Sequence, residues 1–136
     1  MKVIVDTDVW SEALRKKSGK KSAYVVELID LIQEGRIGII GPIRMEVLSG
    51  IRESHISDAF SARLAAFPDI MIPSEIYVLA AKFLNLCRSQ GIQGSNTDFL
   101  ICACSVHWKI PILSKDKDYL LYQKHIPLEI IQPRKK

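Results

Sequence analysis

The sequence predicts an α/β fold in three layers, with a central parallel sheet of four or five strands flanked by helices. Short apolar segments rich in Val and Ile alternate along the 136 residues with longer segments of helical periodicity. Hydrophobic residues make up 48% of the chain and charged residues 25%, which is typical of a globular protein with its own core. Domains of this length are common, so we expect one domain over residues 1–136, with a basic tail at about 133–136.

The expected strands are short apolar runs next to charged residues, Gly or Pro. Continuous apolar runs of this kind are typical of strands buried on both faces of a parallel sheet. The weakest pattern, at residues 69–72, fits an extended link equally well. In chain order, the expected strands are residues 2–5, 36–40, 69–72, 110–113 and 126–131.

Helices are expected between the strands, where apolar residues recur every three or four positions. The clearest covers residues 74–90, with Ser74 as its N-cap and Gly91 just beyond its end. A second helix covers residues 22–34 and is closed by Gly35.

The other helices have weaker signals. Pro42 suits the first turn of a helix that continues to about Gly50, because this turn leaves its N–H groups unbonded and proline has none. Ser54 is a candidate cap for a helix that runs to Phe67. The remaining expected helices are residues 9–16, 97–108 and 119–123.

Acidic residues cluster where two of the expected strands end. Asp6 and Asp8 follow the first strand, and Ser114, Asp116 and Asp118 follow the strand at residues 110–113. The carboxyl ends of parallel strands meet at one edge of a sheet, where ligands bind in open α/β folds. We therefore expect the two clusters to lie close together.

Two further acids lie near helix starts, Asp98 in the first turn of its helix and Glu46 one turn into its own. Each acid has an ordinary explanation when taken alone. Asp98 suits the helix dipole, Glu46 an exposed helix position and Asp116 an Asx turn. Crowded carboxylates, however, raise each other's pKa unless a cation neutralises them. Carboxylate oxygens without nearby His or Cys suit Mg²⁺ or Mn²⁺.

Four segments carry these acids in order. They read VIVDTDVW, GPIRMEVLSG, TDFLICACSV and ILSKDKDY, and they contain Asp6, Glu46, Asp98 and Asp116. In this order and at these separations they resemble the PIN domain family, in particular the VapC-type toxins of toxin–antitoxin pairs. The resemblance spans nearly the whole chain and implies a metal-dependent endoribonuclease that cleaves RNA phosphodiester bonds. The four acids would surround one or two Mg²⁺ or Mn²⁺ ions.

The resemblance also implies a role for each acid. Asp6, Asp98 and Asp116 would bind the metal directly or through water. Glu46 would bind it or orient the attacking water. Ser114 matches a small hydroxyl position that the family places just before the last acid.

Some neighbouring residues are secondary candidates. Asp8 departs from the family pattern, which often has Ser or Asn there, and it is either an additional outer ligand or the cap of the first helix. Asp118 follows the last acid by two residues. Four lysines could steer RNA phosphates, although solvent exposure explains them equally well. They are Lys16, Lys17, Lys115 and Lys117.

Two other functions fit parts of the sequence. The run Asp6-Thr-Asp8 after an apolar strand also resembles haloacid-dehalogenase-type phosphatases, with Asp6 as nucleophile and Asp8 as general acid–base. That family needs Ser or Thr at the end of the second strand and a late Gly-Asp pair, which residues 36–42 and 113–116 lack. The third possibility is a non-catalytic RNA-binding PIN module, but such modules usually lose acids and this chain retains all four.

The sequence also bears on location and partners. No apolar run approaches the roughly 18–20 residues of a membrane span, and no secretory signal precedes the first strand, so a cytoplasmic location is expected. The resemblance implies a small cognate antitoxin, an RNA substrate and a homodimer. One apolar set is either core or partner surface: Tyr24, Val25, Leu28, Phe60, Leu64 and Phe67. Cys87, Cys102 and Cys104 are expected to be buried, unpaired core residues.

Overall fold

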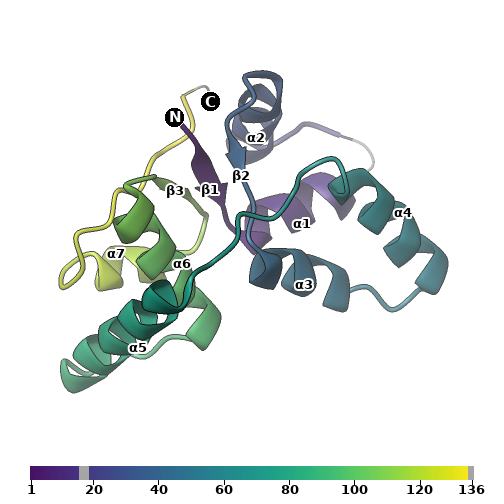
Figure 1. Cartoon of the computed structure of the whole chain (residues 1–136). Helices are drawn as coiled ribbons and strands as arrows, with labels where there is room; N and C mark the ends of the chain where they lie inside the picture. Colours follow the sequence, from purple (N-terminus) through teal and green to yellow (C-terminus); the bar gives the residue numbers. More distant parts are fainter. Residues whose placement is uncertain (16–18, 135–136) are drawn as a thin grey trace.

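The computed structural model describes residues 1–15 and 19–134. Its centre is a parallel sheet with the strand order β2-β1-β3. The strands are β1 (Val3–Val5), β2 (Ile37–Gly38) and β3 (Ile112–Leu113). Ile4 of the middle strand lies opposite Gly38 on one side and Ile112 on the other, so β1 and β3 are neighbours (Figure 1).

The sheet continues at both edges through single parallel bridges. Ile39 pairs with Asp69 beyond β2, and Ile112 pairs with Ile130 beyond β3. The segments expected as strands at residues 69–72 and 126–131 therefore lie beside the sheet, each with one bridge instead of a ladder. The expected α/β architecture is confirmed.

Seven helices flank the sheet in the described part of the chain. In Figure 1, α5, α6 and α7 gather on one side, and α1, α3 and α4 gather on the other. Contacts are densest between α5 and α6, and α1 packs against both α2 and α3. Their bounds are α1 (Thr7–Arg15), α2 (Ala23–Gln33), α3 (Gly41–Ser49), α4 (Ser54–Leu64), α5 (Ser74–Ser89), α6 (Asn96–Trp108) and α7 (Asp118–Tyr122).

Two of the expected helix caps are wrong. Ser74 and Ser54 are the first residues of α5 and α4, while Pro73 and Glu53 occupy the cap positions and make no side-chain cap bond. In α5 the backbone supplies the first acceptor, because the carbonyl of Pro73 accepts from the N–H of Ile76 at 3.0 Å. Serine caps do occur elsewhere, at Ser22 before α2 and Ser95 before α6.

The core surrounds α6, which is buried without interruption from Phe99 to Ser105. Its sequence between Asp98 and His107 carries no charge, so it can lie between the sheet and α5. All three cysteines are free and buried, as expected. Six apolar residues were expected to be either core or partner surface. Val25, Leu28 and Leu64 are buried, and Tyr24 and Phe67 pack against the core. Phe60 is half-buried.

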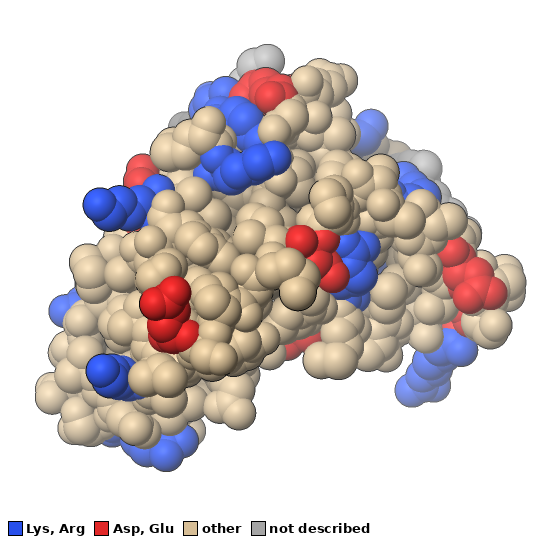
Figure 2. All heavy atoms as spheres, in the orientation of Figure 1, with Lys and Arg blue, Asp and Glu red and all other residues tan. Residues whose placement is uncertain are grey.

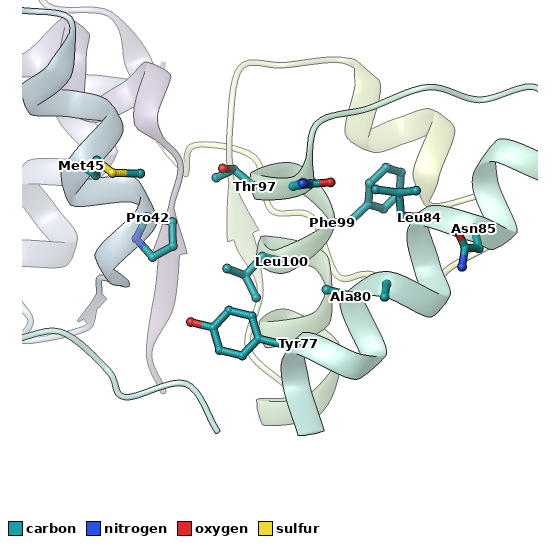
Figure 3. Close-up of a pocket in the computed structure, with 11 residues that line it drawn as sticks. Pro42, Met45, Tyr77, Ala80, Leu84, Asn85, Thr97, Phe99 and Leu100 are labelled. Atoms are coloured by element: carbon teal, nitrogen blue, oxygen red, sulfur yellow. The ribbon is translucent and has the colours of Figure 1, made fainter. Parts of the chain in front are cut away.

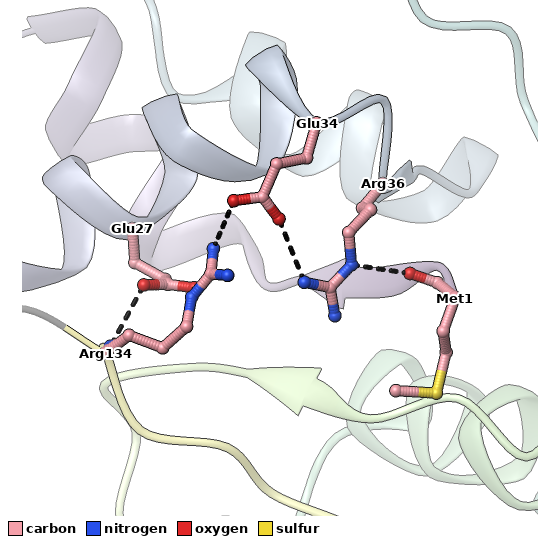
Figure 4. Close-up of polar contacts among 5 residues, drawn as sticks. All are labelled: Met1, Glu27, Glu34, Arg36 and Arg134. Carbon is pink, nitrogen blue, oxygen red and sulfur yellow. Dashed lines mark hydrogen bonds and ion pairs between the residues drawn. The ribbon is translucent and has the colours of Figure 1, made fainter.

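The C-terminal segment is tied to α2 by an ion pair between Arg134, whose side chain is 47% exposed, and the buried Glu27. The Glu27 side chain is 2% exposed and accepts from both the backbone N–H and Nε of Arg134, at 3.0 and 2.8 Å. Arg134 also reaches Glu34, which in turn binds Arg36, and Arg36 donates to the carbonyl of Met1 (Figure 4). Part of the basic tail thus has a structural contact; Lys135 and Lys136 lie outside the described residues.

We expect Arg134→Ala to lower the melting temperature by several degrees, because it leaves the Glu27 carboxylate buried without its cation. Thermal melts followed by circular dichroism would measure the change. Lys124→Ala is the matched control, since Lys124 lies in an exposed turn. Equal melting temperatures for the two variants would show that the tail contact adds nothing to stability.

Candidate active site

The site lies at the edge of the sheet where β1 and β3 end. The N–H of Asp6, directly after β1, donates to the carbonyl of Leu113 at 2.9 Å. Ser114, directly after β3, donates its hydroxyl to Oδ2 of Asp6 at 2.8 Å. The two strand ends therefore meet, and their polar side chains bond to each other.

Asp6 is the most deeply buried acid of the site, with 7% of its surface exposed. Its Oδ1 accepts from the N–H of Thr7 at 2.8 Å. Burial raises the pKa of Asp6 to about 6, even though the Ser114 bond opposes the shift; repulsion from Asp8 and Asp98 adds to it. The folded protein therefore holds this charge at a cost that a cation would relieve.

Glu46 projects from α3 toward the end of β1. Its Oε1 accepts from the Thr7 hydroxyl at 2.8 Å. Thr7 thus contacts two of the predicted acids, Asp6 through its backbone and Glu46 through its side chain. Sequence reasoning did not identify Thr7, although its place between Asp6 and Asp8 was a usable signal.

Asp98 lies in the first turn of α6 and is half-buried. Its Oδ2 accepts from the Tyr122 hydroxyl at 2.8 Å. Burial raises the pKa of Asp98, as does repulsion from Asp116 and Glu46, while the Tyr122 bond lowers it. Sequence reasoning did not identify Tyr122, and no motif pointed to it.

Asp116 is exposed and forms the Asx turn that the sequence allowed. Its N–H donates to the hydroxyl of Ser114 at 3.1 Å, and its Oδ1 accepts from the N–H of Asp118 at 2.9 Å. This turn begins α7. Asp118 contributes its backbone here, and its side chain is exposed.

Asp8 reaches across to the segment after β3. Its Oδ2 accepts from the N–H of Lys115 at 3.0 Å and lies 3.4 Å from the hydroxyl of Ser114. Burial raises the pKa of Asp8. Its Oδ1 is buried and has no hydrogen-bond partner among the described residues.

The lysines give a mixed result. The Nζ of Lys115 forms an ion pair with Glu12 at 2.9 Å, so its charge is engaged within the protein. Lys117 is exposed, and Lys16 and Lys17 lie outside the described residues. On the face in Figure 2, basic side chains form small separate groups with acidic ones among them.

Each of the other three predicted acids interacts electrostatically with Asp98. Asp98 is repelled by Asp116 and Glu46, and Asp6 is repelled by Asp98. Over residues 1–15 and 19–134, however, no three His, Cys, Asp or Glu side chains are spaced to hold one ion directly. The acids offer carboxylate oxygens, the type of ligand that Mg²⁺ takes, and Mg²⁺ usually keeps several of its waters.

An apolar groove is lined in part by the residues that precede two of the acids in the sequence. It has a volume of about 490 Å³ and lies between α3, α5 and α6. Met45 and Tyr77 line it while 64% and 52% exposed, respectively (Figure 3). Met45 precedes Glu46, and Thr97, also in the lining, precedes Asp98.

Comparison with known proteins identifies the class to which this fold and site belong. The profile of the PIN domain family matches residues 3–124, so the chain belongs to that family. It is 26% identical over 119 residues to a VapC ribonuclease of Mycobacterium bovis and to ribonuclease VapC11 of Mycobacterium tuberculosis. Each of these matches covers 86% of this chain and 88% of the relative.

Solved structures show the same fold. VapBC2 from Rickettsia felis, bound to a DNA fragment from its promoter, gives a TM-score of 0.76 at 16% identity and covers 97% of this chain and 98% of its own. FitAcB from Neisseria gonorrhoeae gives a TM-score of 0.71 at 17% identity, and the match covers 96% of this chain and 97% of the other. Membership of the PIN domain family disfavours the phosphatase alternative for Asp6 and Asp8. Across the described helices, none is both long and apolar enough to cross a membrane.

Proposed function

We propose that this protein is a metal-dependent endoribonuclease, and that it is the toxin of a toxin–antitoxin pair. The main support is that Asp6, Glu46 and Asp116 all interact electrostatically with Asp98 in a chain of the PIN domain family. Relatives over most of the chain are ribonucleases, which supports RNA as the substrate. A non-catalytic RNA-binding module would not need to hold these charges together against their repulsion.

Asp6, Asp98 and Asp116 would hold Mg²⁺ or Mn²⁺, directly or through water, and Glu46 would bind it or orient the attacking water. The ion would lower the pKa of a bound water and polarise the phosphoryl group. The chain's own hydroxyls fix the acids in place. Ser114 holds Asp6, and Thr7 holds Glu46. Such preorganisation matters because phosphodiester hydrolysis needs its attacking and leaving oxygens held in line.

Incubating the purified protein and Mg²⁺ with an end-labelled RNA pool tests this function. We expect internal cleavage products with the wild-type protein and none with an Asp116→Asn variant purified in parallel. The variant controls for contaminating host ribonucleases, which would cut with either sample. Identical products from both, or intact RNA with both, would contradict the proposal.

Asp8 separates the nuclease from the phosphatase mechanism. We expect Asp8→Asn to retain partial RNA cleavage, because Asp8 binds the backbone of Lys115 and is at most an outer ligand. The phosphatase mechanism instead makes Asp8 a general acid–base and predicts severe loss. Cleavage rates of Asp8→Asn and Asp6→Asn, measured side by side, decide this. Equal and complete loss would contradict the outer role of Asp8.

We also propose two protein partners in the cytoplasm. A groove of about 410 Å³ between α1, α2 and α4, lined in part by Trp10, Leu14 and Ile29, suits an apolar segment of a small antitoxin. The groove of Figure 3, with exposed Met45 and Tyr77, suits a second copy of the chain. Co-purification with the product of a neighbouring small reading frame tests the first, and sedimentation of the pure chain tests the second.

A further inference from the structure

The short helix α7 brings a phenol to one of the predicted metal ligands. Tyr122 is fully buried, and its hydroxyl donates to Oδ2 of Asp98 at 2.8 Å. The two residues are 24 positions apart in the chain, so only the packing of α7 on α6 brings them together.

Packing fixes the Tyr122 ring in this position. Its centroid lies 4.7 Å from that of Phe99 and 5.4 Å from that of Tyr119. Gly94 covers the phenol from the loop before α6. A Cβ at Gly94 would lie 2.8 Å from Cζ of Tyr122 and 2.9 Å from Cε2 of Phe99, so a side chain there would displace the ring.

The same segment also carries two other parts of the site. Ser114 holds Asp6, and Asp116 forms the turn that starts α7. Tyr122, which bonds to Asp98, lies four residues after Asp118, the first residue of α7. Residues 114–122 therefore contact or contribute three of the four acids.

From this geometry we infer that Tyr122 is a positioning residue for the metal centre. By bonding to Oδ2 of Asp98, the Tyr122 hydroxyl restricts rotation of the carboxylate and leaves Oδ1 for another partner. The inference rests on the proposed function, because it assumes that Asp98 serves a divalent ion. Groups that bond to metal ligands typically contribute about 10–100-fold to metal affinity.

Tyr122→Phe tests this role, because it removes the hydroxyl and keeps the ring. We expect Mn²⁺ to bind about 10–100-fold more weakly, measured on the free protein by electron paramagnetic resonance of unbound Mn²⁺. RNA cleavage should need correspondingly more Mn²⁺ for half-maximal rate, and its kcat should return close to the wild-type value at saturating Mn²⁺. If the Tyr122 hydroxyl were only structural, its removal would lower the stability of the protein but would not change Mn²⁺ affinity or the Mn²⁺ concentration needed for half-maximal cleavage.

Tyr119→Phe is the matched control. Tyr119 lies on the same helix, is equally buried, and has no hydrogen-bond partner for its hydroxyl among the described residues. Removing the Tyr119 hydroxyl should leave Mn²⁺ binding unchanged and keep the melting temperature at or above that of the wild type. If Tyr122→Phe fails to fold, Gly94→Ala provides a second variant that displaces the phenol and should weaken Mn²⁺ binding in the same way.

The outcomes separate the inference from the proposed function. If the wild type binds Mn²⁺ and cleaves RNA, but Tyr122→Phe binds Mn²⁺ as tightly as Tyr119→Phe does, the positioning role is wrong and the nuclease remains. If the wild type neither binds Mn²⁺ nor cleaves RNA, the proposed function fails, and the role of Tyr122 fails with it.

Discussion

Replacing Asp6 with Asn is expected to abolish RNA cleavage and, at the same time, to stabilise the metal-free protein at neutral pH. The cleavage is lost because a central ligand is removed. The stability rises because Asp6 is 7% exposed and its pKa is raised from 3.8 to about 6, mainly by burial. Ionising this carboxyl in the fold costs about 3 kcal/mol, at about 1.36 kcal/mol per pKa unit.

The pH dependence follows from the same shift. Between pH 3.8 and about 6 the folded protein binds more protons at Asp6 than the unfolded chain does. The stability that the protonated carboxyl contributes is therefore fully present below pH 3.8 and is lost as the pH rises to about 6. Urea unfolding in EDTA across this range would show the fall for the wild type and a flatter profile for Asp6→Asn. A variant that is less stable than the wild type at pH 7 would contradict the account.

The second large effect concerns Asp98. We expect Asp98→Asn to raise the metal-free melting temperature or leave it unchanged, because one charge repelled by Asp116 and Glu46 is removed. Metal that binds only the folded wild type should stabilise it by about 2.7 kcal/mol at a hundredfold excess over its dissociation constant. In Asp98→Asn this Mg²⁺-induced rise should shrink, and RNA cleavage should disappear.

Scanning fluorimetry of the wild type and Asp98→Asn, in EDTA and in Mg²⁺, measures the metal-free melting temperature and the Mg²⁺-induced rise. Asn can still accept the Tyr122 hydrogen bond, so the local packing is retained. If the variant melts much lower in EDTA yet keeps the full Mg²⁺ response, Asp98 is a structural residue at the start of α6. The four-acid centre would then be wrong at that position.

The sequence predicted the parts of the fold that local patterns encode. Apolar runs alternating with amphipathic segments located the central strands and most helices. Asp6 and Ser114 could be placed at one edge because parallel strands end together. The caps of α4 and α5 were misassigned to Ser54 and Ser74, since a serine beside a helix start does not reveal which backbone carbonyl accepts the first bond.

The residues that hold the acids could not be predicted in the same way. The bond from Tyr122 to Asp98 depends on how α7 packs on α6, and no spacing in the sequence encodes that packing. Lys115 is a second example. The sequence indicated a solvent-exposed lysine there, and nothing in it indicated the ion pair with Glu12. Contacts between distant segments appear only once the chain is folded.

The central claim is that the acids at the ends of β1 and β3 form a metal-dependent ribonuclease centre. The most direct measurement is the rate of cleavage of one labelled RNA by protein stripped of metal with EDTA, before and after Mg²⁺ or Mn²⁺ is restored. We predict no cleavage by the stripped protein and recovery on addition of either ion. Undiminished cleavage in EDTA would contradict the account.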